Sequence, residues 1–375
     1  MHNLALTKTP EAPSVSRLVS LQSKWIVKAD MSIRVRRSGL LSPDRDSLIT
    51  LFRRHLAVDY AEERFDWLYH RGPHGSALAW IATDGPAGKP IAAAAAFPRR
   101  VYCNGQEKLG LVLGDFCMNE EFRSLGPSVQ LQRACVEAAQ QAPLEFFYDF
   151  PSTAMMAVYR RLGVVQTASF VRWVKLLRVE NKLQPLVRSK SIAKVAGSVA
   201  NSALSYLGWK GDANSCELEL LQGFCTEEFT HFDEQVRTRE GIQTVRNASY
   251  LNWRYLDPAA PTHQILTARR QGTLVGYVVY ANRRDDGYIM DLNSLEEPSV
   301  IARLLAGAVQ TLSASGVSAV NLHAADVHPW SSIFQRAGFR KRESSPLVAG
   351  SQPAGGISNL NFQNKWYAMS GERDS

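Results

Sequence analysis

Three landmarks in the first half of the chain recur in the same order in the second half. The landmarks are a pair of aromatic residues, an aspartate inside an apolar run, and a glycine that closes a short helical pattern. The matched residues are Trp67 and Trp253, Tyr69 and Tyr255, Asp115 and Asp291, and Gly163 and Gly338. The separations of 186, 176 and 175 residues stay close to one value. A nearly constant offset favours two copies of one folding unit that differ by loop insertions.

The length of 375 residues also predicts two domains of ordinary size. We expect a leader without chemistry at residues 1–30, a first domain at 31–180, a linker at 181–215 and a second domain at 216–375. The linker carries apolar residues at helical intervals beside lysines. This pattern favours a helix that packs between the domains, and contact of that helix with a membrane surface is the less favoured alternative.

Composition limits the class of protein. The content of 45% hydrophobic and 21% charged residues is that of a globular chain. The net charge of +8 is compatible with a nucleic acid, an anionic membrane or a phosphorylated ligand, and charge alone does not choose among them. The five cysteines form no CxxC pair, which favours a reducing, cytoplasmic compartment. The chain contains neither a signal-peptide core nor an apolar run of about 18 residues.

The periodicity of the first domain alternates between strands and helices. It predicts strands at 77–83, 91–99, 109–118, 144–150 and 170–177, and helices at 47–57, 127–140 and 153–162. This order predicts an α/β fold, in which a mixed, mostly antiparallel sheet has helices on both faces. We expect the second domain to repeat it.

The segment from Arg123 to Ser128 lies between an apolar strand and a helix. Backbone N–H groups of such a turn, together with the N-terminus of the helix, can bind a phosphate. Gly126 would allow the backbone to approach that phosphate closely. Pro127 lacks an N–H group, so one potential donor is missing.

This segment reads Arg-Ser-Leu-Gly-Pro-Ser and resembles the pyrophosphate loop of the GNAT superfamily of acyl-CoA N-acyltransferases. In that family an Arg or Gln is followed after two residues by Gly, and after one more by Gly or Ala. The resemblance covers residues 31–180 and implies that acetyl-CoA or another acyl-CoA is the cosubstrate. The cofactor-binding residues that it implies are Phe116, Met118, Arg123, Ser124, Leu125, Gly126 and Ser128.

The same resemblance assigns a role to Tyr159, because the matching tyrosine of many such enzymes protonates the departing CoA thiolate. The acceptor amine must also lose a proton, and Asp149 is our candidate for the base. Asp115 is favoured as a structural residue, because Asp291 repeats it in the second half. We expect no metal ion at this site.

The second domain lacks both features of the cofactor site. After Asp291 the sequence continues to Pro298 with Glu296 and Glu297 and no glycine, and Phe334 stands where the first domain has Tyr159. Glutamates would repel a pyrophosphate. We therefore expect a degenerate GNAT-like domain that completes the acceptor pocket or supports the first domain.

The roles of two other groups of residues stay open. His323, Asp326, His328 and Trp330 form either a hydrogen-bonded loop, an acceptor contact or a metal site, although their spacing matches no ordinary zinc pattern. The aromatic residues around Trp67 and Trp253 either line a cleft between the domains or pack in a core.

The resemblance implies an N-acyltransferase that moves an acyl group, most simply acetyl, from acyl-CoA to an amine. Tandem proteins of this kind are associated with bacterial envelope or exopolysaccharide assembly, so an amino sugar is the acceptor class that we expect. We expect no nucleic-acid partner. The alternatives are a Fem-like aminoacyl transferase that uses charged tRNA, and a non-catalytic binding or scaffold protein.

Overall fold

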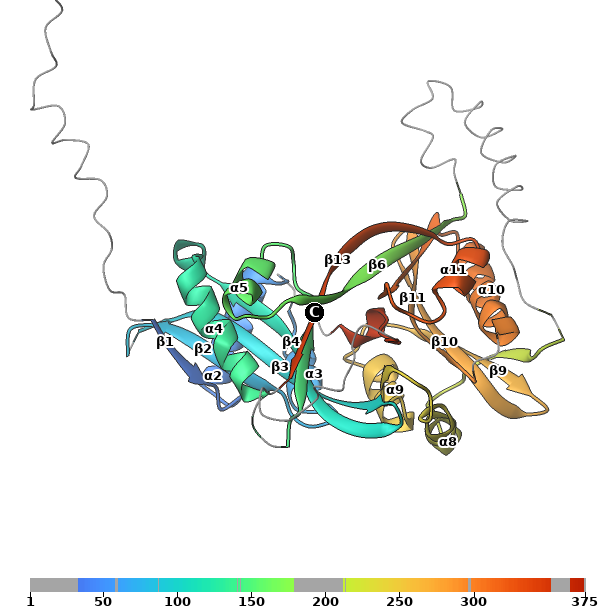
Figure 1. The fold of residues 1–375 in the computed structure, drawn as a ribbon, viewed down its shortest axis with the longest axis horizontal. Coiled ribbons are helices and arrows are strands. Elements are labelled where there is room, and N and C mark those ends of the chain that lie inside the picture. The colour runs from blue at the N-terminus through green and yellow to red at the C-terminus, as the bar shows by residue number, and fades with distance from the viewer. Residues whose placement is uncertain are drawn as a thin grey trace, which may run out of the picture.

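The computed structural model describes residues 33–57, 60–86, 88–139, 141, 143–178, 212, 214–295, 298–351 and 365–373. The expected leader and most of the expected linker lie outside these residues. The first half of the chain and the second half lie side by side, and the C-terminal end lies between them (Figure 1).

The first half follows the predicted alternation of strands and helices. Its elements are β1 (Ile33–Arg37), α2 (Asp44–His55), α3 (Glu62–Tyr69), β2 (Leu78–Asp84), β3 (Pro90–Cys103), β4 (Gln106–Met118), η2 (Glu120–Phe122), α4 (Leu125–Ala138), β5 (Phe146–Asp149), α5 (Met156–Arg161) and β6 (Gln166–Leu176).

The second half repeats much of this order. Its elements are β7 (Glu217–Leu220), α8 (Glu227–Val236), β8 (Ile242–Thr244), α9 (Ala248–Leu251), η3 (Asn252–Leu256), β9 (Gln264–Arg270), β10 (Thr273–Arg283), β11 (Asp286–Ser294), α10 (Pro298–Ala314), β12 (Ala319–Ala325), α11 (Ser331–Arg336), β13 (Arg340–Ser351) and η4 (Ser370–Glu372).

The strands of the described residues form one sheet that runs through both halves. Its order is β1-β2-β3-β4-β5-β13-β6-β12-β11-β10-β9-β7, and β8 pairs with β3 beside this path. The β4–β5 and β11–β12 pairs are parallel, whereas the other pairs are antiparallel. The prediction of a mixed, mostly antiparallel α/β sheet is confirmed.

The last strand of each half pairs with the other half. β13 comes from the second half and pairs with β5, while β6 comes from the first half and pairs with β12. β6 and β13 also pair with each other at the centre of the sheet (Figure 1). Because of this reciprocal exchange, neither half completes its sheet with its own strands.

Helices cover both faces of the sheet, and strand alternation shows which residues face which layer. On β3, Ala93 and Ala95 pack in the cluster formed with α2 and α3, whereas Ala92 and Ala94 face the cluster formed with α4 and α5. In the second half the two layers are α8 with α9 and α10 with α11. The alanine run of β3 is therefore buried continuously, as expected for a strand with both faces covered.

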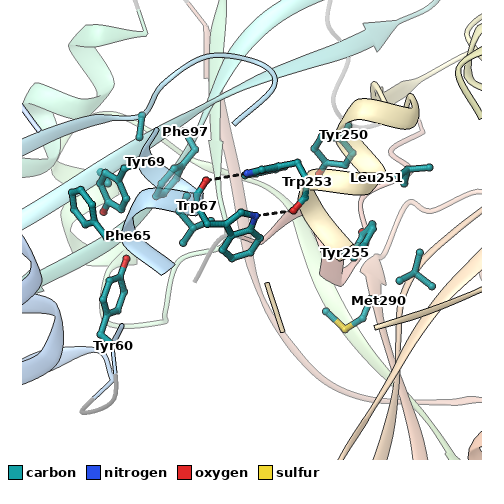
Figure 2. Packing of buried hydrophobic residues seen from close by; sticks show 14 of the residues in the cluster. Tyr60, Phe65, Trp67, Tyr69, Phe97, Tyr250, Leu251, Trp253, Tyr255 and Met290 are labelled. Atoms are coloured by element: carbon teal, nitrogen blue, oxygen red, sulfur yellow. Dashed lines mark hydrogen bonds between the residues drawn. The ribbon is translucent and has the colours of Figure 1, made fainter. Parts of the chain in front are cut away.

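Trp67 and Trp253 join the two halves by a reciprocal pair of hydrogen bonds (Figure 2). The Trp67 indole N–H donates to the Trp253 carbonyl at 2.7 Å, and the Trp253 indole N–H donates to the Trp67 carbonyl at 2.9 Å. Their rings lie 5.5 Å apart, and both residues are buried in a cluster shared by the two halves. The sequence left two interpretations open for these residues, the lining of a cleft and packing in a core. The structure shows packing in a core.

In the part of the chain that the structure describes, no helix combines the length and the apolar character needed to cross a bilayer.

We expect Trp67→Phe and Trp253→Phe to destabilise the protein to similar extents. Each substitution leaves one buried carbonyl without its indole donor, which costs about 1–3 kcal/mol in addition to the lost ring volume. Urea unfolding followed by circular dichroism at far-ultraviolet wavelengths would measure both effects.

Trp173→Phe is the matched control, because Trp173 is equally buried and its indole nitrogen has no hydrogen-bond partner in the described structure. If Trp67→Phe and Trp253→Phe lower the free energy of unfolding no more than Trp173→Phe does, the role of the reciprocal hydrogen bonds is contradicted. A second, separate unfolding transition would show that the halves unfold independently despite their shared sheet.

Candidate functional site

The candidate site lies where β4 and β5 separate. The two strands pair in parallel through Gly110–Phe146, Leu111–Phe147 and Val112–Tyr148. β4 then continues to Met118 beside β3, while β5 reaches Asp149 beside β13. Beyond Val112 the two strands therefore diverge and leave the β5-facing edge of β4 without a strand partner.

Asp115 lies at an irregular point of β4. The register between β3 and β4 shifts between Ala93 and Ala95, and Asp115 has a φ of 46°. Asp tolerates this left-handed conformation better than most residues. The Tyr69 hydroxyl donates to Asp115 Oδ2 at 2.8 Å in the core. The structural role of Asp115 stays a prediction.

The second half repeats this contact. The Tyr255 hydroxyl donates to Asp291 Oδ2 at 3.1 Å, and the register of β10 against β11 shifts next to Val279, which faces Asp291. In both halves, a tyrosine from the helical layer thus holds an aspartate next to a β-bulge. Bulges of this kind redirect a strand and often adjoin active sites.

A cavity of about 540 Å³ opens beside the end of β4. Its walls come from α2, β4, the loop after β4, the start of α4 and the start of α5. The lining residues are His55, Phe116, Cys117, Met118, Arg123, Ser124, Leu125, Ser128, Ser152, Ala154, Met155, Ala157 and Val158. Of the cofactor-binding residues that the sequence suggested, all but Gly126 line this one cavity.

The helix after the loop begins at Leu125, two residues earlier than the sequence suggested. Ser124 is extended, with φ −140° and ψ 165°, so the first-turn N–H groups of Leu125 and Gly126 have no acceptor within the helix. A Cβ atom at Gly126 would meet no atom within 4 Å. Pro127 has no N–H group, so this turn has one donor fewer. The Ser128 N–H donates to the Ser124 carbonyl at 3.3 Å.

Side chains brace this loop from within. Arg123 Nε donates to the Met118 carbonyl at 3.0 Å, which ties the loop back to the end of β4. The Ser128 hydroxyl donates to the Ser124 carbonyl at 2.8 Å. Two backbone donors, Leu125 and Gly126, therefore remain at the helix start for an anionic ligand.

Tyr159 and Asp149 lie together, beside the cavity rather than among its lining residues. The Tyr159 hydroxyl donates to Asp149 Oδ2 at 2.5 Å and accepts a hydrogen bond from Gln132 Nε2 at 2.8 Å. The Tyr159 side chain is fully buried, whereas the preceding Val158 lines the cavity. The catalytic roles of Tyr159 and Asp149 stay predictions.

Burial controls the protonation of this pair. It raises the pKa of Tyr159 well above its ordinary value, so the phenol stays protonated. Burial also raises the pKa of Asp149 from 3.8 to about 7, against the opposing effect of the hydrogen bond from Tyr159. Asp149 can therefore change its charge near neutral pH.

Several residues that line the cavity were not predicted from the sequence. His55 ends α2, and Cys117 alternates with the expected Phe116 and Met118 on β4. Met155 precedes α5, the helix that carries Tyr159. The helical periodicity around Tyr159 was a signal from which the residues of α5 could have been predicted. No local pattern indicated that the end of α2 lies beside the end of β4.

In the second half, an arginine occupies the space between β11 and α11. The Arg239 guanidinium donates to Asn293 Oδ1 at 2.8 Å. Its central carbon lies 5.6 Å from the Trp330 ring and 5.5 Å from the Tyr367 ring. Arg239 is 8% exposed, so this group is part of the protein interior.

These residues correspond in sequence to residues of the first-half cavity. The offsets of 176 and 175 residues match Asn293 with Cys117 and Trp330 with Met155, and both first-half residues line the cavity. Arg239 therefore contacts the residues that match two cavity-lining residues by sequence offset. The acidic residues Glu296 and Glu297 lie outside the described residues.

The polar residues of the 322–330 segment make separate contacts. His323 Nδ1 lies 3.3 Å from the Ser370 hydroxyl, Asp326 accepts from the Ser169 N–H, and His328 Nδ1 accepts from the Trp330 N–H. Burial lowers the pKa of His328 to about 3, which keeps its ring neutral.

No protein-family model matches the chain, and no curated protein sequence matches it significantly. Among solved structures, similar ones include a probable N-acyltransferase from Enterococcus faecalis (14% identity, 85% of this chain and 73% of that chain, TM-score 0.60). A GCN5-related N-acetyltransferase from Anabaena variabilis is similar at 12% identity (84% and 72%, TM-score 0.60).

A third similar structure is the N-myristoyltransferase of Saccharomyces cerevisiae with bound myristoyl-CoA, at 10% identity (94% of this chain and 86% of that chain, TM-score 0.56). Identities this low carry the likeness of the fold and nothing finer. The chain therefore has the α/β fold of the GCN5-related N-acetyltransferases, and the likeness extends through both of its halves.

Proposed function

We propose that this protein is an acyl-CoA-dependent N-acyltransferase that binds its cosubstrate in the cavity beside β4. The observation that carries the proposal is the position of the cavity, at the divergence of two parallel strands and against the first turn of a helix. The residues that the motif singled out form much of its wall. The fold shared with N-acyltransferases supports the same chemistry.

Each part of an acyl-CoA has a matching feature in this cavity. The pyrophosphate fits the N–H groups of Leu125 and Gly126 at the positive end of the α4 dipole. The amide-bearing arm fits the free edge of β4 between Phe116 and Met118, where β5 no longer supplies hydrogen bonds. The apolar side chains of Met155 and Val158 would cover that arm from α5.

We keep Tyr159 as the proposed acid for the departing thiolate and Asp149 as a candidate base. Support comes from their direct hydrogen bond and from the position of Asp149 at the end of β5, where the strands separate. The full burial of Tyr159 means that its proton would reach the cavity only through a change in the α5 wall.

We infer that the two halves are copies of one unit, with the first domain at 31–180, the linker at 181–215 and the second domain at 216–375. The repeated tyrosine–aspartate contacts and the reciprocal tryptophan bonds support this inference. In the second copy, Arg239 contacts the residues that match two cavity-lining residues by sequence offset. One acyl-CoA per chain is the resulting stoichiometry.

An amino sugar used in envelope or exopolysaccharide assembly remains our proposed acceptor, on the strength of the family resemblance. We place the reaction in the cytoplasm. All five cysteines are free and buried, as expected for a protein of a reducing compartment.

Gly126→Glu should weaken acetyl-CoA binding at least about tenfold, because a carboxylate would face the pyrophosphate at the helix start. A glutamate in a first turn is compatible with the helix dipole, and open space surrounds Gly126, so the fold should persist. Isothermal titration calorimetry measures the affinity.

Gly126→Gln is the control, because glutamine has the size of glutamate without its charge. Equal affinity of the two variants would contradict the assignment of this turn to the pyrophosphate. Failure of the parent protein to bind acetyl-CoA or a longer acyl-CoA would favour the non-catalytic scaffold.

Tyr159→Phe should lower the turnover of acetyl-CoA with glucosamine and leave the affinity for acetyl-CoA nearly unchanged. The phenyl ring fills the same space but supplies no proton, and it leaves Asp149 and Gln132 without their shared partner. Release of the CoA thiol gives the rate. Tyr277→Phe is the control, since Tyr277 is equally buried and its hydroxyl has no partner in the described structure. An unchanged rate would make Tyr159 structural.

Asp149→Asn should flatten part of the dependence of stability on pH. The pKa of Asp149 is about 7 in the folded protein and near 3.8 when exposed, so the folded state binds more protons between these values. The free energy of unfolding of the parent should therefore fall as pH rises through this window. Urea unfolding at about pH 5 and about pH 8 should show a smaller fall in the variant. Parallel behaviour would mean that Asp149 is ionised throughout.

A further inference from the structure

His55 brings a titratable ring to the wall of the cavity. It is the last residue of α2, is half-buried, and lines the same cavity as Phe116 and Cys117 of β4. Asn119, directly after β4, holds it: His55 Nε2 lies 2.8 Å from Asn119 Oδ1. The ring is thus fixed between the end of a helix and the end of the strand that borders the cavity.

The neighbouring arginine determines which ring nitrogen carries the proton. Arg54 Nη1 lies 3.5 Å from the same Asn119 atom, and a guanidinium only donates hydrogen bonds. That atom of Asn119 is therefore the carbonyl oxygen, so His55 Nε2 must be the N–H donor. In the neutral ring, Nδ1 then carries the lone pair that can accept a proton.

The other lining side chains cannot take this role. Burial raises the pKa of Cys117 to about 12, so its thiol stays neutral. The guanidinium of Arg123 only donates hydrogen bonds. The remaining lining residues are hydroxyl, thioether or hydrocarbon side chains. Among the residues that line this cavity, His55 alone carries an imidazole, whose neutral ring has a nitrogen lone pair that can accept a proton.

We propose that His55, in place of the candidate Asp149, is the general base of the transferase, acting through Nδ1, and that Asn119 positions it. This proposal rests on the proposed function. The amine nitrogen attacks the thioester carbonyl carbon, its proton passes to Nδ1, and the C–N bond forms. The C–S bond then breaks, and the CoA thiolate takes the proton of Tyr159 and leaves as a thiol. The imidazolium then loses its proton, which restores the Tyr159 phenol. The products are the amide and CoA, with no further reactant.

Two cations lie near His55: Arg54 contacts the same oxygen of Asn119, and Arg123 lines the same cavity. The lining residues include no carboxylate. Asp149, by comparison, lies outside the lining and already accepts the Tyr159 hydroxyl.

His55→Gln tests the proposal with acetyl-CoA and glucosamine as substrates. Turnover should fall by about 100-fold or more, the usual contribution of a general base, while calorimetry gives an unchanged affinity for acetyl-CoA. His231→Gln is the control, because His231 is exposed on α8 of the other half. A rate equal to that of the parent overturns the proposal. So does weakened acetyl-CoA binding with unchanged turnover, which would make His55 a cofactor contact.

Asn119→Asp tests the positioning role by a different readout. A carboxylate in place of the amide would stabilise the protonated ring, so the acidic limb of the pH profile of turnover should move to higher pH. An unmoved limb overturns the link between Asn119 and the base.

Nuclear magnetic resonance of the imidazole nitrogens tests the geometry without an acceptor. In the neutral state the proton should reside on Nε2 of His55, and a proton on Nδ1 overturns the proposal. The proposed function fails separately, if the parent protein binds no acyl-CoA. A parent that transfers the acyl group while His55→Gln does so equally fast refutes only the role of His55.

Discussion

The backbone hydrogen bonds between β5 and β13 are the constraint on which the candidate site depends. β5 has four residues, and it leaves β4 after Tyr148 while β13 still pairs with Asp149. The peptide groups of a strand point alternately to its two neighbours, so β13 holds β5 in place on the side away from β4. Where β5 leaves β4, the peptide groups on that edge of β4 become available to a ligand, and the cavity opens beside them. The second half thus shapes the site of the first by supplying a strand.

The centre of the molecule is also held by buried charge. Arg246 donates to Asp291 at 2.9 Å and to Glu372 at 2.8 Å, and all three side chains are 2% exposed. A buried arginine is tolerated when carboxylates and carbonyls satisfy its donors, and the Tyr367 carbonyl supplies a further acceptor at 3.2 Å. Glu372 and Tyr367 belong to the C-terminal segment, which also bridges to Ile242 and Ala324. The last described residues are thus fastened to the middle of the sheet.

The sequence was sufficient for features that depend on local periodicity and failed for those that depend on which elements meet. The strand–loop–helix around Gly126 could be predicted because apolar runs and a turn are local patterns. The start of α4 at Leu125 was missed, since the helical period does not reveal that Ser124 is extended. The exchange of β6 and β13 could not be predicted, because alternation reports which face of a strand is buried and not which strand lies beside it. His55 was missed for the same reason: its contact with Asn119 joins residues 64 positions apart.

The exchange of strands sets an order of events during synthesis. β1 to β5 and α4 can begin to form as soon as they leave the ribosome, in line with the general tendency of N-terminal parts to fold first. β5 receives its second neighbour only when residues 340–351 have been made. Until then the edge of β5 is open, and the geometry that opens the cavity lacks its support. A nascent chain, or one broken off before β13, would carry every residue of the cavity wall without the completed cavity. Completion of the candidate cavity therefore depends on residues 340–351.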